Sequence, residues 1–243
     1  LAGQAALLEG FVDFSHEVSV IGARGGDGAV CCFDPGENVH SNGILRTTTL
    51  PARLSAAQRM DAVLLTANIL NALDYVGVMG VELFVTSEGL IVNEIAPRVH
   101  NSGHWTQNGC VVDQFEQHIR AIADWPLGDG TRHCDVVMEN LIGDDMGRIG
   151  TIVKDPTSAV HLYGKAEIKP GRKMGQRNRI VPAQTRTSLK KTLGHRPGQI
   201  TGAAFGKGGH HPLAVRIKHD EIAAHTNFQS AAIRQAQNPR RAT

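Results

Sequence analysis

The sequence predicts a fold that mixes strands and helices, of the α+β or α/β class, because two apolar patterns interleave along residues 1–190. Short β-branched runs bounded by turn residues indicate strands, and apolar residues at helical spacing indicate helices between them. The chain has 243 residues, 41% hydrophobic and 20% charged, which is typical of a globular protein with a sizeable core. These patterns argue against an all-helical fold.

The first predicted element is a β-hairpin over residues 17–33. Val18-Ser19-Val20-Ile21 is rich in β-branched residues, Arg24-Gly25-Gly26-Asp27-Gly28 is typical of a turn, and residues 29–33 return as a strand. The next segment, Pro35-Gly36-Glu37-Asn38, has the composition of a loop.

Two helices are predicted in the first half of the chain. One covers residues 55–73, with Ser55 as its N-cap. Its apolar stripe consists of Met60, Val63, Leu64, Ala67 and Leu70. The other ends before Pro126, and its apolar spacing is set by Val112, Phe115, Ile119 and Ile122.

A second hairpin is predicted from strands at residues 76–85 and 90–95, joined by Ser87-Glu88-Gly89. A three-residue loop usually has a glycine at its left-handed position, and this loop pairs Glu82 with Glu94. The two carboxylates then project from one face, roughly 5 Å apart at Cβ. Residues 136–142 and 160–163 are further predicted strands.

Glu82 and Glu94 are candidate magnesium ligands. Like charges directly opposite each other destabilise a sheet, so a compensating cation is expected. Magnesium takes one or two protein carboxylates and completes its shell with water and phosphate oxygens. Spacing alone leaves open the alternative of two solvated glutamates on an exposed face.

The segment after the second hairpin is dense in polar side chains. Pro97 ends the strand, because proline cannot donate to a ladder. Arg98, His100 and Asn101 then follow just past the carboxylates, where an arginine can bind a small anion in a bidentate fork. A surface loop with incidental polarity is the alternative.

The segment from Asn93 to Gln107, NEIAPRVHNSGHWTQ, closely resembles the signature of the 5-(carboxyamino)imidazole ribonucleotide synthase family. These enzymes are ATP-dependent ligases. Residues 17–25, 43–46 and 169–175 resemble the same family in the same order, and the resemblance covers about residues 1–190. It implies the α+β ATP-grasp fold, in which two lobes close on the nucleotide.

The resemblance also implies a domain organisation. Residues 1–125 correspond to the C-terminal lobe of the ATP-grasp domain, an antiparallel sheet with flanking helices. Residues 126–194 correspond to a small C-terminal β-rich domain. Residues 195–243 do not match the family's ending, and their weak periodicity predicts an atypical, disordered basic tail. The family's N-terminal Rossmann-like domain is expected to be absent, because residue 1 already lies near the adenine hinge. We therefore expect an incomplete fragment that does not turn over ATP alone.

The family phosphorylates bicarbonate with ATP, and the resulting carboxyphosphate, or carbon dioxide from it, carboxylates the exocyclic amine of aminoimidazole ribonucleotide. The resemblance implies a nucleotide-binding set: Glu9, Gly10, Phe11 and Val12 at the adenine hinge, Glu17 at the ribose, and His40, Asn93 and Glu94. It implies Mg²⁺, which Mn²⁺ could replace, at Glu82 and Glu94. It implies bicarbonate and carboxyphosphate at Arg98, His100 and Asn101. It implies the ribonucleotide phosphate at Lys165, Arg172 and Lys173.

Two alternatives remain. Another ATP-grasp ligase, of the glycinamide ribonucleotide transformylase or biotin carboxylase type, is disfavoured by His100-Asn101-Ser102-Gly103-His104-Trp105. A nucleic-acid-binding module is the rival class, because residues 195–243 carry seven Lys and Arg but two Asp and Glu. Its candidate phosphate contacts are Lys207, Arg216, Lys218, Arg240 and Arg241. The tail lacks an aromatic stacking pattern, so a nucleic-acid partner is not expected.

The expected location is the cytoplasm, without a membrane partner. No apolar run approaches the roughly 18 residues of a membrane span. The four cysteines lack C-x-x-C spacing and are expected to be reduced thiols. The resemblance implies a homodimer for the full-length protein.

Overall fold

The computed structural model describes residues 10–181, and residues 1–9 and 182–243 lie outside this description. The predicted tail over residues 195–243 is therefore outside it, and the domain boundaries at residues 125 and 194 stay predictions. The strands are β1 (His16–Arg24), β2 (Val30–Cys32), β3 (Gly36–Ser41), β4 (Ile44–Leu50), β5 (Gly77–Val85), β6 (Leu90–Ala96), β7 (Asp135–Ile142), β8 (Ser158–Leu162) and β9 (Lys173–Val181). The helices are α1 (Ala56–Ala72), α2 (Thr106–Gly109), α3 (Gln114–Ile122) and α4 (Ile149–Ile152), with 3₁₀ turns η1 (Asn101–Gly103) and η2 (Gly143–Arg148).

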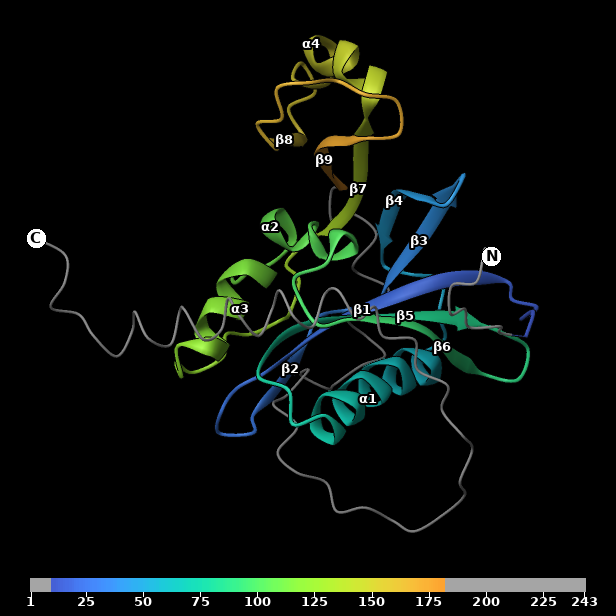
Figure 1. Ribbon diagram of the computed structural model, residues 1–243, viewed down its shortest axis with the longest axis vertical. Helices are drawn as coiled ribbons and strands as arrows, with labels where there is room; N and C mark the ends of the chain where they lie inside the picture. Colours follow the sequence, from blue (N-terminus) through green and yellow to red (C-terminus); the bar gives the residue numbers. More distant parts are fainter. Residues whose placement is uncertain (1–9, 182–243) are drawn as a thin grey trace, which may run out of the picture.

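The strands form one antiparallel sheet in the order β6-β5-β1-β3-β4-β7-β9-β8, with β2 also pairing with β1. The antiparallel pairing and the segregated helices confirm the α+β class. Figure 1 shows β1, β5 and β6 over α1 at one end and β7, β8, β9 and α4 at the other. The strands of the predicted small C-terminal domain thus continue the sheet of the first domain.

Strand β1 is the centre of the first half of this sheet. One edge pairs along its whole length with β5, and the other edge pairs with β2 near Arg24 and with β3 near Glu17. The predicted hairpin over residues 17–33 is confirmed. The predicted loop over residues 35–38 is wrong from Gly36 onward, because Gly36 begins β3 and pairs with Ser19. A Cβ at Gly36 would lie 2.5 Å from Thr48, so this glycine serves close strand approach rather than a turn.

Helix α1 begins as predicted, with a capping box. The Ser55 hydroxyl accepts from the Gln58 backbone N–H, and the Gln58 side-chain oxygen accepts from the Ser55 backbone N–H. The predicted apolar stripe is partly wrong, because Met60 is 50% and Leu64 40% exposed. The face that packs on the sheet consists of Ala62, Thr66, Ala67, Ile69 and Leu70. The buried face uses small residues because α1 lies close to β1, where a Cβ at Gly22 would meet Leu70 at 2.7 Å.

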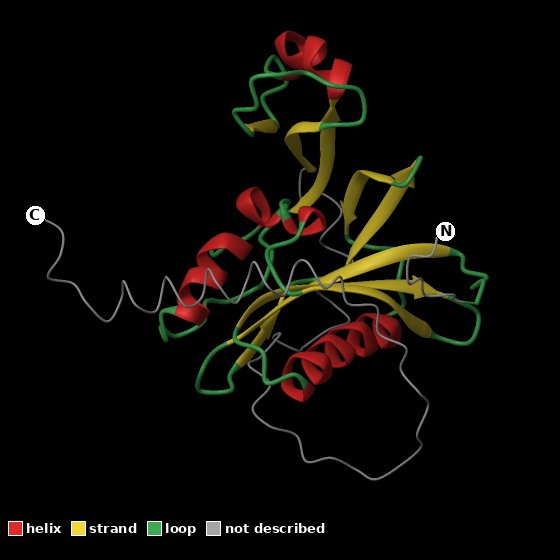
Figure 2. Cartoon of the chain, in the orientation of Figure 1, coloured by secondary structure: helices red, strands yellow, loops and turns green. Residues whose placement is uncertain are grey.

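The sheet separates two hydrophobic clusters. One lies between the strands and α1 and includes Val18, Val20, Val81 and Leu83. The other lies on the opposite side, around Trp105. Figure 2 shows α1 on one side of these strands and α2 and α3 on the other.

This alternation places the site residues. Successive strand residues point to opposite faces, so Val18 and Val20 face α1 while Glu17 and Ser19 face away from it. Ser19 pairs with Glu82 across the β1–β5 ladder. The face of β1 and β5 opposite α1 therefore carries a row of polar side chains above an apolar core.

Helix α3 buries a polar face, contrary to the predicted apolar stripe. Phe115 and Ile119 are 37% and 47% exposed. The buried residues are Gln114, Gln117, His118 and Ala121. Each buried polar side chain has a backbone partner: Gln114 bonds His100, Gln117 bonds Gly128 and His118 accepts from Val78. Burial of these groups is therefore compatible with a stable fold.

No helix over residues 10–181 is long and apolar enough to cross a membrane. Cys31, Cys32, Cys110 and Cys134 are all free thiols, as the sequence predicts. Burial raises the pKa of the Cys31 thiol, which favours its protonated form.

Candidate active site

The predicted pairing of Glu82 with Glu94 is confirmed. The turn that joins the two strands differs from the predicted three-residue loop, because Val85 pairs with Leu90 rather than with Ile91. The turn is closed by a bond from Thr86 N to Gly89 O of 2.9 Å, and a bulge at the position of Asn93 then restores the register. The two carboxylates thus lie opposite each other on adjacent strands.

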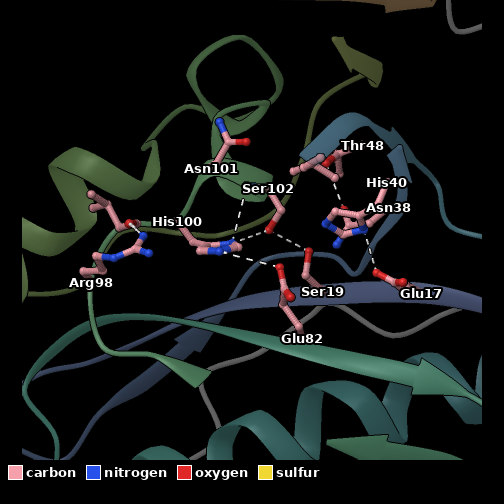
Figure 3. A network of polar contacts seen from close by, with 12 residues as sticks. Glu17, Ser19, Asn38, His40, Thr48, Glu82, Arg98, His100, Asn101 and Ser102 are labelled. Atoms are coloured by element: carbon pink, nitrogen blue, oxygen red, sulfur yellow. Dashed lines mark hydrogen bonds and ion pairs between the residues drawn. The ribbon is translucent and has the colours of Figure 1, made fainter. Parts of the chain in front are cut away.

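His100 lies beside Glu82, one member of this pair, as Figure 3 shows. Its Nε2 is 3.6 Å from Oε1 of Glu82, and both side chains are largely shielded from solvent. The imidazole passes directly above Gly80, where an added Cβ would approach the His100 Cβ to 2.7 Å. Gly80 therefore provides the space in which the ring reaches Glu82.

The side chain of Gln114 holds the loop after β6 through two hydrogen bonds to the His100 backbone. The side-chain Oε1 of Gln114 accepts from the His100 backbone N–H at 2.9 Å, and its Nε2 donates to the His100 carbonyl at 2.8 Å. Gln114 is fully buried. The amide thus holds His100 as a neighbouring strand would, and the loop carries its polar side chains in a fixed geometry.

Asn101 connects this loop to the last strand. Its Oδ1 accepts from Nζ of Lys173 at 2.9 Å, and its amide exchanges two bonds, of 2.8 and 2.9 Å, with the buried Asn140. Asn140 also donates to the Leu45 carbonyl at 3.0 Å. Burial lowers the pKa of Lys173, while the charge of Glu82 works in the opposite direction. The ammonium of Lys173 is therefore close enough to Glu82 to interact with its charge.

The other two predicted phosphate-binding cations lie on the loop before β9. Nζ of Lys165 donates to the Lys173 carbonyl at 2.7 Å and lies 5.6 Å from the centre of the Tyr163 ring. Arg172 donates to the Glu167 carbonyl at 3.2 Å. Gly171 between them has a φ of +73°, a conformation that favours glycine. Lys165 and Lys173 are thus brought together by a direct bond, and Arg172 adjoins Lys173 in the chain.

Two of the predicted nucleotide-binding residues, Glu17 and His40, form a second group on the same face. Glu17 on β1 and His40 on β3 meet at 2.7 Å, between Oε2 and Nδ1. Phe14 stacks on Phe84, with ring centroids 4.3 Å apart and an interplanar angle of 16°. Of the predicted hinge, Phe11 is 96% exposed, Gly10 and Val12 adjoin it, and Glu9 lies outside the described residues.

Sequence reasoning missed the residues that support this site. Ser19, Ser102, Gln114 and Asn140 are all buried polar residues that hold the predicted ones in place. Strand alternation from Glu17 could have identified Ser19 as a residue on the same face. Ser102 lies two residues after His100, which it contacts, whereas Gln114 and Asn140 are distant in sequence from the residues that they hold, so no local pattern indicates these two.

A buried polar interface continues from this loop to β9. The His104 carbonyl accepts from Asn178 at 3.0 Å, and Nε2 of Gln176 donates to Gln107 at 2.6 Å. Burial lowers the pKa of His104 to about 4, with smaller contributions from nearby cations including Lys173. His104 is therefore neutral at physiological pH.

The carboxylates of Glu82 and Glu94 fit a magnesium ion that takes most of its ligands from phosphate oxygens and water. Within residues 10–181 no group of three or more His, Cys, Asp or Glu side chains could hold a metal. The two carboxylates of Glu82 and Glu94 are what a magnesium ion shared with phosphate oxygens and water would use. The roles of all these site residues remain predictions.

Replacing Gly80 by alanine is expected to displace His100 and to lower stability by about 1–3 kcal/mol, the usual cost of overpacking. The new methyl group would approach the His100 Cβ to 2.7 Å and its Cγ to 2.8 Å. Urea denaturation measures the change. Gly150→Ala is the matched control, because a Cβ there meets nothing within 4 Å. Equal stability changes in the two variants would contradict the tight contact at Gly80.

Comparison with known proteins agrees with this geometry. Residues 1–115 match the model of the ATP-grasp domain family. Residues 136–182 match the model of the phosphoribosylaminoimidazole carboxylase C-terminal domain. The antiparallel sheet with paired carboxylates and these matches define an ATP-grasp protein.

Curated relatives identify the family. The chain is 54% identical over 178 residues to N5-carboxyaminoimidazole ribonucleotide synthase of Brucella melitensis biotype 1, covering 73% of this chain and 49% of that protein. It is 46% identical to the Escherichia coli enzyme of the same name, covering 71% of this chain and 48% of that one. The chain belongs to the N5-carboxyaminoimidazole ribonucleotide synthase family. It spans about half the length of the curated relatives that it matches.

Solved structures give the same result. The Aspergillus clavatus synthase, solved in complex with ADP and 5-aminoimidazole ribonucleotide, superimposes with a TM-score of 0.69 at 32% identity, over 75% of this chain and 50% of that one. The Thermus thermophilus synthetase has a TM-score of 0.67 at 38% identity, over 78% of this chain and 54% of that one. Both the sequence resemblance and the predicted ATP-grasp fold are therefore confirmed.

Proposed function

We propose that this chain contributes the magnesium, bicarbonate and ribonucleotide-phosphate side of an active centre for a step of purine biosynthesis. In that step ATP phosphorylates bicarbonate, and the exocyclic amine of 5-aminoimidazole ribonucleotide is carboxylated to give N5-carboxyaminoimidazole ribonucleotide, ADP and phosphate. The names of the relatives support the reaction, and the Aspergillus clavatus complex supports both nucleotide ligands. Bicarbonate is part of the proposal alone.

One observation carries the proposal: Lys173 Nζ donates to Asn101 Oδ1 at 2.9 Å. This bond joins the loop that follows Glu94 to Lys173, the first residue of β9, which directly follows the cationic loop. The two loops are 72 residues apart in sequence, yet their side chains form one polar surface. A substrate with a phosphate at one end and a reacting amine at the other could contact both loops.

The residues divide the work by charge. A magnesium ion at Glu82 and Glu94, or manganese in its place, would supply positive charge to the ATP phosphates. Arg98 offers a planar guanidinium that binds a carboxylate or phosphate in two places. Asn101 positions the Lys173 ammonium, and fixed donors of this kind stabilise charge that develops during transfer. His100 lies beside Glu82, with its Nε2 3.6 Å from Oε1 of that carboxylate.

The substrate and nucleotide ends complete the proposal. Lys165, Arg172 and Lys173 are assigned to the ribonucleotide phosphate, with Gly171 allowing close backbone approach. Glu17, His40, Asn93 and the segment around Phe11 are assigned to ATP. Their support is the Glu17–His40 contact on the same face as Glu82. A cytoplasmic location and a homodimer are the remaining parts of the proposal.

Equilibrium binding tests the assignment without requiring turnover. Isothermal titration of the chain with 5-aminoimidazole ribonucleotide, in the presence of Mg²⁺ and ADP, is expected to show saturable binding. Glycinamide ribonucleotide and biotin are the comparison ligands, because they represent the other ATP-grasp ligases. Preferential binding of either comparison ligand would contradict the proposal. Lys173→Met should weaken binding of the ribonucleotide. Lys154→Met is the matched control for this variant.

A further inference from the structure

A chain of hydroxyl groups ends on the His100 ring, beneath the site. Ser19 Oγ donates to Ser102 Oγ at 2.7 Å, and Ser102 Oγ lies 2.8 Å from Nδ1 of His100. Ser19 is 3% and Ser102 1% exposed, so water does not compete for these bonds. Figure 3 shows Ser19, Ser102 and His100 joined one to the next by dashed lines, with a further contact from the imidazole to Glu82.

The direction of these bonds identifies the protonated ring nitrogen. The backbone N–H of Ser102 donates to His100 Nδ1 at 3.4 Å, and a backbone amide cannot accept. Nδ1 must therefore carry a lone pair. The hydroxyl groups fit this arrangement, because Ser102 can accept from Ser19 and donate its own proton to Nδ1. A neutral imidazole whose Nδ1 accepts carries its proton on Nε2.

We propose that Ser19 and Ser102 are positioning residues that hold His100 as the Nε2-protonated tautomer. The ring then presents an N–H donor toward Glu82, whose Oε1 is 3.6 Å from Nε2. A protonated Nε2 cannot ligate a metal, so His100 acts as a hydrogen-bond donor beside the carboxylate pair and not as a third metal ligand. The role of this donor toward bound bicarbonate or carboxyphosphate rests on the proposed function, whereas the assignment of the tautomer does not.

The imidazole ¹⁵N shifts of uniformly labelled chain test the tautomer, at a pH at which His100 is neutral. His100→Gln identifies the resonances by their loss. In the unmodified chain we expect Nε2 to show the shift of a protonated nitrogen and Nδ1 that of an unprotonated one. The opposite pattern, or rapid exchange between equal populations, would overturn the proposal whether or not the chain binds ribonucleotide.

Variants test the two serines separately. Ser102→Ala removes a hydroxyl bond to Nδ1 and is expected to shift the tautomer ratio toward Nδ1–H on the order of three- to tenfold. Ser19→Ala is expected to shift it less, because Ser102 then still reaches the ring but is free to accept. Thr66→Ala is the control: it removes a buried hydroxyl that bonds Ala62, on the α1 side of the sheet. An unchanged ratio in both serine variants, with folded spectra, would overturn the proposal.

Discussion

Replacing Glu82 and Glu94 together by glutamine is expected to remove the binding of divalent cations to this chain. The two carboxylates lie opposite each other on β5 and β6 and are the only protein charges that the proposal assigns to the ion. Loss of an outer-shell partner alone typically weakens metal binding by about 10- to 100-fold. Loss of two direct ligands should therefore weaken it by at least about 100-fold.

Titration with Mn²⁺, followed by electron paramagnetic resonance in the presence of ADP, measures this change. Glu88→Gln is the control, because Glu88 is an exposed carboxylate in the turn of the same hairpin. The double variant should also unfold no more easily than the unmodified chain when metal is absent, because like charges placed opposite each other destabilise a sheet. Metal affinity that survives the double substitution would show that the ion binds elsewhere.

The stability of the chain is expected to fall as the pH drops from about 6.5 toward 4, and His104 is a main cause. Burial lowers the pKa of His104 to about 4, below the ordinary value of about 6.5 in the unfolded chain. Between these two values the unfolded state binds more protons, so acid favours unfolding. The contribution is at most about 3 kcal/mol, because one pKa unit corresponds to about 1.36 kcal/mol.

Urea denaturation at several pH values measures this dependence. His104→Asn keeps an acceptor for Gln114, whose Nε2 lies 2.7 Å from Nδ1 of His104, but cannot titrate. Its stability should change less steeply with pH in this window. The Asp145 and Glu37 carboxyl groups, whose pKa values are lowered by ion pairs and hydrogen bonds, titrate in both proteins and cancel in the comparison. Equal slopes for the two proteins would contradict the assignment to His104.

The parts of the fold that the sequence predicts well depend on neighbours close in the chain. Ser55 and Gln58 form their capping box within one turn of helix. The hairpin that pairs Glu82 with Glu94 is bounded by its own turn, although the pairing is reached through a bulge at Asn93. The prediction of that pair succeeded because the wider turn and the bulge displace the register in opposite directions.

The failures come from contacts between distant segments. Residues 36–38 have the composition of a loop, and only pairing with β1 makes them a strand. Helix α3 has apolar residues at helical spacing, but Gln114 and His118 face inward because His100 and Val78 offer backbone partners there. A hydrophobic pattern cannot indicate such partners, since they come from other elements.

The candidate site divides in the same way. Glu82, Glu94, Arg98, His100 and Asn101 lie within one continuous segment whose composition indicates chemistry. The approach of Lys173 to Asn101, and the support of Asn101 by Asn140, depend on the pairing of β7 with β4 and β9. The sequence indicates the candidate groups, and the antiparallel sheet sets the distances between them.

The central claim is that the carboxylate pair and the cationic loop before β9 form one centre. The most direct measurement is the ³¹P line width of 5-aminoimidazole ribonucleotide bound to the chain when Mn²⁺ replaces Mg²⁺. A paramagnetic ion at Glu82 and Glu94 is expected to broaden the phosphorus signal of the bound ribonucleotide, and the double glutamine variant should abolish the broadening. A bound ribonucleotide whose phosphorus signal stays sharp with Mn²⁺ present would contradict the claim.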